Sequence, residues 1–217
     1  MRRRPMLVAG LVAVAVTLAA AAEAYAAPGD NLKFVLEGSA TRATSPTDAK
    51  DDVVKIDTTG GAIGDVYHVL NQTVHALDGR LSLDYFFVDR SCGGGAPRIS
   101  LAVDTDGDGA YDTVADGFVG PAPNFTGCQP NAWRHEDLTD AAPHWDVRKV
   151  GVGLVLVAVP WSAVEAYFAA QPAEEVQFGV LADDAGGFFA AAAGVAYYDT
   201  VVMGPYVLER FSDVSSN

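Results

Sequence analysis

Short apolar runs, separated by residues that favour turns, follow one another along the chain from about residue 34 onward. The clearest run is residues 81–88, in which Leu81, Leu83, Tyr85 and Phe87 fall on one face of an extended strand before the pattern becomes apolar on both faces. Seven further strand regions are predicted at residues 34–37, 53–56, 65–77, 99–103, 111–119, 176–181 and 194–202. This pattern indicates a protein built mainly of short strands.

Three connections are also predicted from local residue chemistry. Region 65–77 is expected to form two neighbouring strands that turn at Asn71, and residues 183–187 are expected to turn between the last two strands. Residues 121–140 carry several prolines and no sustained period, which indicates a long surface excursion. One helix is predicted to open at Ser162, because Glu165 three residues later completes a capping box.

Many short strands, regular turns and one lone helix favour an all-β fold of two antiparallel sheets packed as a sandwich. The N-terminus has the three-part pattern of a secretion signal: three arginines, an apolar run, and small residues at the two positions before a cleavage site after Ala26. We therefore expect a signal peptide at residues 1–26, a single sandwich domain at 27–211 and a flexible tail at 212–217. The mature chain is expected to be extracellular and to have no membrane anchor.

The chain is strongly acidic, with a formal charge of −14. Removal of residues 1–26 takes away three arginines and Glu23, which leaves 11 basic and 27 acidic side chains and a formal charge of −16. Such a field repels phosphate backbones and anionic membranes. The charge therefore disfavours nucleic acid and favours cations as partners.

The two cysteines, Cys92 and Cys128, both lie in the predicted mature part. In an oxidising exterior a disulfide between them is the expected state. Such a bond would close a loop of about 36 residues and stabilise the fold by about 3 to 4 kcal/mol. A catalytic thiol is the alternative interpretation, and it requires a partly exposed thiolate with a histidine partner.

The most distinctive chemical pattern is the acidic glycine loop at residues 104–112, in which carboxylates recur at loop positions 1, 3, 5 and 9. Calcium prefers six to eight oxygen ligands, and this spacing predicts a Ca²⁺ site. The expected ligands are the side chains of Asp104, Asp106, Asp108 and Asp112 and the carbonyl of Ala110.

A plain hairpin turn is the alternative interpretation of this loop, since Asp-Gly pairs reverse the chain by themselves. Position 12 is Ala115, so the usual bidentate glutamate is missing, and Asp116, Asp112 or a water would have to compensate. If calcium binds, we expect it to stiffen the hairpin rather than to perform chemistry.

Trp133 and Trp145 lie in or beside the long excursion and are the best candidates for an exposed aromatic platform, together with Tyr111 and Trp161. Flat aromatic faces engage sugar rings, which carry both polar and apolar faces. The competing interpretation is that these aromatics pack in the core or anchor loops.

His135, Glu136 and Asp137 form the only candidate cluster for acid–base or metal chemistry. A solvated loop cluster explains the same residues, and the sequence contains neither a nucleophile elbow nor a zinc-protease histidine pair. We therefore predict no catalytic residues and no enzyme activity.

Two groups of segments resemble known proteins. Residues 87–95, followed by 104–112 and 124–128, resemble a loosely defined group of exported prokaryotic proteins without an assigned activity. Residues 196–201 look like the closing strand of jelly-roll, galactose-binding-like modules. The likeness implies a jelly-roll sandwich, often stiffened by calcium and often directed to carbohydrate, with no catalytic residues to carry over.

These observations favour a secreted, non-catalytic, calcium-stabilised β-sandwich that binds extracellular glycan or another cell-surface polymer. The first alternative is a structural or adhesive surface protein that needs no small ligand. A secreted hydrolase or lyase that uses His135, Glu136 and a nearby Asp is the last alternative. Exposure of Trp133 and Trp145 would favour glycan binding, and an apolar surface patch would favour the structural or adhesive role.

Overall fold

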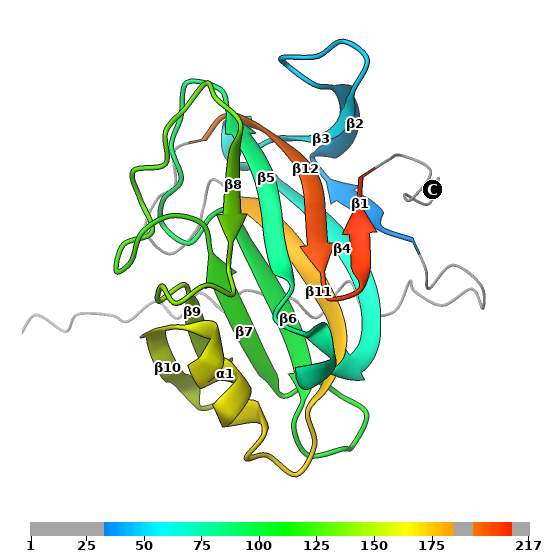
Figure 1. Ribbon diagram of the computed structural model, residues 1–217, viewed down its shortest axis with the longest axis vertical. Helices are drawn as coiled ribbons and strands as arrows, with labels where there is room; N and C mark the ends of the chain where they lie inside the picture. Colours follow the sequence, from blue (N-terminus) through cyan, green and yellow to red (C-terminus); the bar gives the residue numbers. More distant parts are fainter. Residues whose placement is uncertain (1–32, 185–192, 210–217) are drawn as a thin grey trace, which may run out of the picture.

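The computed structural model describes residues 33–184 and 193–209, which form two antiparallel sheets packed face to face (Figure 1). The predicted all-β sandwich with one short helix is confirmed. The predicted signal peptide and the predicted tail at 212–217 lie outside the described residues. No helix among the described residues is long and apolar enough to cross a membrane.

One sheet has six strands, with β13 paired to the end of β12 beside the main path. In spatial order its members are β2 (Ala40–Thr44), β3 (Asp52–Asp57), β12 (Val195–Met203), β5 (Leu81–Phe87) and β8 (Arg134–Asp137), with β13 (Tyr206–Leu208) at the side. The outer face of this sheet carries the pocket that is described below.

The other sheet has seven strands. In spatial order these are β1 (Val35–Gly38), β4 (Ile63–Thr73), β11 (Glu175–Asp184), β6 (Arg98–Asp104), β7 (Thr113–Phe118), β9 (Trp145–Lys149) and β10 (Gly153–Val159). Helix α1 (Trp161–Phe168) follows β10, and two short 3₁₀ turns lie at η2 (Thr59–Gly61) and η3 (His75–Leu77).

The strand order is that of a jelly roll. Four strands of one sheet run in the order β3-β12-β5-β8, and four strands of the other run in the order β4-β11-β6-β7. The pairs β3–β12, β4–β11, β5–β8 and β6–β7 are therefore nested, as if one long hairpin of eight strands had been wrapped around a common core. The remaining strands extend these two sheets at their edges.

The core lies between the sheets and follows the alternation that the sequence predicted. Leu81, Leu83, Tyr85 and Phe87 of β5 are all buried and point toward the opposite sheet. Removing an aliphatic or aromatic side chain of this size from water stabilises the fold by about 1.5 to 3 kcal/mol. Phe86 faces the other way, yet it is also buried, which shows that something covers the outer face of β5.

The expected turn at Asn71 is wrong, because β4 continues through this residue to Thr73. Asn71 has a left-handed backbone, with φ of 45°. The register of β11 against β4 shifts opposite it, between Val176 and Phe178, so the extra residue is accommodated as a bulge. Pairing along the whole of β11 overrides the local turn signal.

Two further expectations need correction. The helix begins at Trp161 after Pro160, and no side chain caps its N-terminus, so the capping box at Ser162 does not form. The buried indole of Trp161, which packs on Trp145, fixes the start of the helix instead. Asp183 and Asp184 belong to strand β11 rather than to a turn, and both are buried.

Candidate functional site

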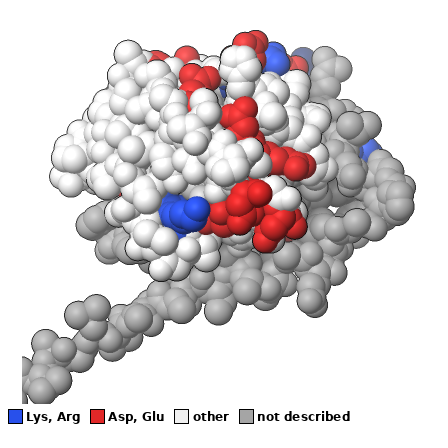
Figure 2. Space-filling view, turned by 90° about the horizontal axis from the view of Figure 1, so that it is seen from below, with Lys and Arg blue, Asp and Glu red and all other residues white. Residues whose placement is uncertain are grey.

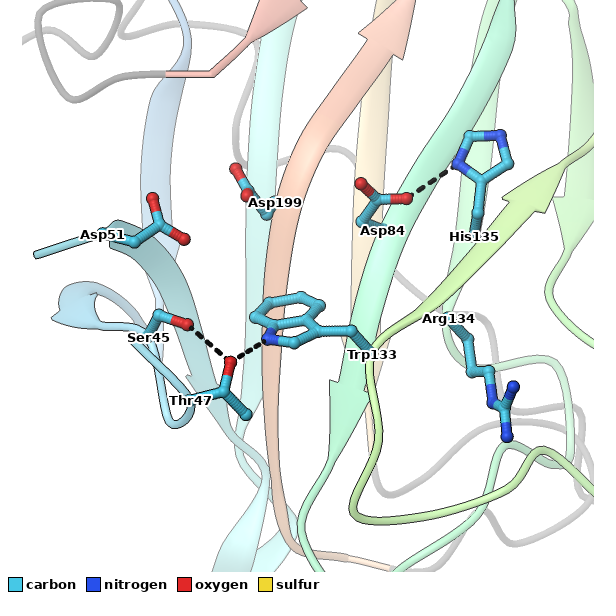
Figure 3. Close-up of a pocket in the computed structure, with 8 residues that line it drawn as sticks. All are labelled: Ser45, Thr47, Asp51, Asp84, Trp133, Arg134, His135 and Asp199. Carbon is cyan, nitrogen blue, oxygen red and sulfur yellow. Dashed lines mark hydrogen bonds and ion pairs between the residues drawn. The ribbon is translucent and has the colours of Figure 1, made fainter. Parts of the chain in front are cut away.

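A pocket of about 310 Å³ lies on the outer face of the six-stranded sheet (Figure 3). The strands β12, β5 and β8 supply one part of its lining, and the loop between β2 and β3 supplies the other. It is lined by Ser45, Thr47, Asp51, Asp84, Trp133, Arg134, His135 and Asp199. Its volume is at the lower end of the range for small-ligand sites.

Trp133 is the aromatic element of this pocket. Its indole lies across β12 from the side of β8, and it is only partly buried (Figure 3). The indole Nε1–H donates a hydrogen bond of 2.9 Å to Thr47 Oγ1, and the ring lies 5.8 Å from that of Phe86. These contacts explain the burial of Phe86 and hold the Trp133 ring in one orientation.

Three carboxylates lie beside this indole. Asp84 on β5 and Asp199 on β12 are register partners, and Asp51 precedes β3. Figure 3 shows the three in a row along one side of the Trp133 ring, while Arg134 extends away from them. Burial raises the pKa of Asp199, and the charges of Asp51 and Asp84 add to that effect. The pocket is therefore rich in hydrogen-bond acceptors.

The chain segment before β8 is tied down at several points, which positions Trp133. Cys92 and Cys128 form the predicted disulfide, with their Cα atoms 5.3 Å apart. The Asn131 N–H donates to the Phe87 carbonyl over 2.7 Å, and the Asn131 amide nitrogen donates to Asp89 over 2.8 Å. The excursion that the sequence predicted is thus fastened to the end of β5.

Trp145 does not lie on the surface, so its prediction as a ligand-binding residue is wrong. Its side chain is fully buried, and its Nε1–H donates to the Leu138 carbonyl over 2.6 Å. The ring covers Gly117 on the neighbouring strand β7, where an added Cβ would come within 2.6 Å of the indole. The absence of a side chain at Gly117 thus makes the space that Trp145 fills.

Tyr111 does not join Trp133 either. Its ring packs edge-on against Phe178 on the seven-stranded sheet, with the centroids 5.5 Å apart. Of the aromatic residues singled out in the sequence, only Trp133 lies in the pocket.

His135, Glu136 and Asp137 lie on strand β8 rather than in a loop. Strand alternation separates the first two: His135 Nδ1 lies 2.7 Å from Asp84 Oδ1 on the outer face, whereas Glu136 accepts a hydrogen bond from the Gly120 N–H and lies 3.7 Å from His144. Burial raises the pKa of Glu136. The three residues of this candidate cluster therefore do not meet as one group, and His135 pairs with Asp84 instead.

The acidic loop joins β6 to β7 as a hairpin at the lower end of the molecule in Figure 1. One carboxylate oxygen each from Asp104, Asp106 and Asp108 lies within 4.8 Å of the others. Asp104 is buried, and hydrogen bonds from the backbone N–H groups of Gly109, Gly107 and Asp106 lower its pKa. Figure 2 shows this end of the molecule, where acidic side chains gather in a band beside one basic patch.

The structure does not bring Asp112 into this group. Its carboxylate accepts a hydrogen bond of 2.6 Å from the Thr105 hydroxyl and lies 3.6 Å from Lys149 Nζ. Ala110 donates its N–H to Asp108. The donor set is therefore three carboxylates, which are hard oxygen ligands of the kind that Ca²⁺ prefers, and the remaining ligands would have to be backbone carbonyls or waters.

Comparison with protein-family models, with curated proteins and with solved structures gave no significant match. What the chain binds is therefore inferred from the pocket and the hairpin themselves.

Proposed function

We propose that the protein is an exported, non-catalytic sandwich that binds extracellular carbohydrate at the Trp133 pocket and is stabilised by Ca²⁺ at the β6–β7 hairpin. The observation that carries the proposal is the partly exposed indole of Trp133, which is held across the sheet by Thr47 and Phe86 beside three carboxylates. An aromatic face next to hydrogen-bond acceptors matches a sugar ring, whose C–H face stacks while its hydroxyls donate.

Preorganisation supports this proposal. A side chain that is already fixed loses little conformational freedom when a ligand arrives, so more of the contact energy contributes to affinity. The Cys92–Cys128 disulfide, the Asn131 contacts and the Thr47 hydrogen bond all restrict the segment that carries Trp133. The disulfide also suits an oxidising extracellular environment, as does the signal-like N-terminus.

Replacing Trp133 with alanine is expected to weaken binding of soluble oligosaccharides by roughly 10- to 100-fold, because it removes the stacking face, which supplies about 1 to 3 kcal/mol. Titration calorimetry against a panel of neutral and amino-sugar oligosaccharides would measure the change. Trp133→Phe keeps a flat ring and is the matched control, with an intermediate affinity expected. A sugar that binds Trp133→Ala as tightly as the parent protein would show that the pocket is not the site.

The calcium part of the proposal has its own test. Millimolar CaCl₂ is expected to raise the melting temperature by roughly 3 to 8 °C relative to EDTA, because an ion bound only by the native state stabilises it. Asp106→Ala should abolish this difference. Asp112→Asn should retain it, since Asp112 faces Thr105 and Lys149 instead of the carboxylate group. Identical melts of the parent protein in CaCl₂ and EDTA would leave the loop as a plain hairpin.

A structural or adhesive role without a small ligand is the second candidate function. Several aliphatic side chains of strand β10 and of the turn before it are exposed, and the exposed fraction reaches 72% at Val152 in that turn. This apolar edge lies on the seven-stranded sheet, apart from the Trp133 pocket.

A further inference from the structure

Strand β10 forms one edge of the seven-stranded sheet and exposes aliphatic side chains on both of its faces. Together with Val150 and Val152 in the turn between β9 and β10, these residues form what we call the β10 apolar edge. The exposed fractions are Val150 61%, Val152 72%, Leu154 59%, Val155 38% and Val157 60%. Apart from Ile63, at 54%, these are the large hydrophobic residues that the described part of the chain exposes. Hydrophobic exposure is therefore concentrated at one place in the fold.

The sequence of β10 is that of a central strand. Gly153–Val159 contains no charged residue and no proline, although edge strands usually carry such residues to prevent pairing with another chain. A strand that is apolar on both faces is typical of one with neighbours on both sides. The strand order ends at β10, so within the described residues one row of its backbone N–H and C=O groups faces no further strand (Figure 1).

We propose that β10 pairs with β10 of a second copy of this chain, antiparallel and about a twofold axis, so that two seven-stranded sheets become one continuous sheet. Backbone hydrogen bonds across the axis would pair the N–H and C=O groups of β10 that face no further strand within one copy. Each aliphatic side chain would then meet an identical surface on the partner, since a twofold interface is self-complementary. Full contact of the two edges would bury on the order of 1,000 Å², which is about the lower limit for a specific interface.

The net charge of the chain opposes association of two copies in general, and the β10 apolar edge is the place where this repulsion is weakest. The whole chain has a formal charge of −14, so most of its surfaces repel another copy, but the β10 apolar edge is uncharged. The neighbouring cations are neutralised within their own copy: Arg148 Nε lies 3.0 Å from Asp116, and Lys149 Nζ lies 3.6 Å from Asp112. Anionic membranes are disfavoured by the acidic field, and a sugar gains little from aliphatic side chains.

The test is the oligomeric state of the protein from Ala27 onward, which keeps every residue of the two sheets. Sedimentation velocity between about 1 and 200 µM should show a species of twice the monomer mass. Leu154→Lys with Val157→Lys in one chain should weaken the dimer by roughly 100-fold or more, because like charges would face each other across the axis. Ile63→Lys, an equally exposed aliphatic position on β4, is the matched control and should leave the dimer intact.

A mixing experiment makes the test independent of any folding defect. The Leu154→Glu, Val157→Glu variant should be monomeric by itself, as should the double lysine variant, and an equimolar mixture of the two should restore the dimer. A parent protein that stays monomeric over the whole concentration range overturns the proposal, whether or not it floats with phosphatidylcholine vesicles. A double lysine variant that dimerises like the parent also overturns it.

Discussion

Replacing Trp145 with alanine is expected to lower the free energy of unfolding by about 3 to 5 kcal/mol, the cost of emptying a large, fully buried aromatic site. The indole fills the space above Gly117 and packs on Trp161, and its N–H donates to the Leu138 carbonyl. Alanine would leave a cavity and a buried carbonyl without its donor. Urea unfolding with the disulfide intact would measure the loss.

Trp133→Ala is the matched comparison, because it removes the same side chain from a partly exposed position. We expect its effect on unfolding to be a small fraction of that of Trp145→Ala, whereas the proposed function predicts the larger effect on sugar binding for Trp133→Ala. Equal destabilisation by the two substitutions would contradict the assignment of one tryptophan to the core and the other to the pocket.

Asp183→Asn is expected to destabilise the fold by about 3 to 5 kcal/mol, because it removes the charge that compensates the buried Arg90 guanidinium. Arg90 follows β5, Asp183 lies on β11, and the Tyr198 hydroxyl on β12 donates to Asp183 over 2.6 Å, so the group joins the two sheets. Burial raises the pKa of Asp183, and the Arg90 charge opposes that shift.

Tyr198→Phe is the control for this group, since it removes one hydrogen bond and no charge, and it should cost about 1 to 2 kcal/mol. Arg90→Met combined with Asp183→Leu should recover much of the loss, because it removes both buried charges together. Chemical denaturation would measure the free energy of unfolding of the three variants. An Asp183→Asn protein within about 1 kcal/mol of the parent would contradict the stabilising role of the Asp183 charge.

The sequence predicted the features that depend on local spacing. The alternation at residues 81–87 identified the inner face of β5, and the Asp-Gly pattern at 104–112 identified the β6–β7 hairpin. The cysteine count predicted the Cys92–Cys128 bond. In each case the signal lies within one short segment or in one pair of residues.

The sequence could not separate Trp133 from Trp145, because the difference is made by distant residues. Gly117 makes room for Trp145, whereas Thr47 holds Trp133 on the outer face. Asp199 was missed as a pocket residue for the same reason, since only the pairing of β12 with β5 brings it beside Asp84. The outward position of Asp84 was the one available signal, because it alternates with the buried residues of β5.

The nested strand order also favours an order in time for the formation of the two proposed sites. The β6–β7 hairpin is the innermost pair and closes over the short loop at residues 105–112. Strand β3 instead meets β12 across most of the chain: Thr58, just after β3, is hydrogen-bonded to Gly194, just before β12, although the two lie 136 positions apart in the sequence. Long-range closure of this kind is slow, because its loop entropy must be overcome before any contact compensates for it. A folding intermediate in which β12 is still unpaired would thus hold the acidic hairpin, but it would lack the wall of the Trp133 pocket that Asp199 supplies.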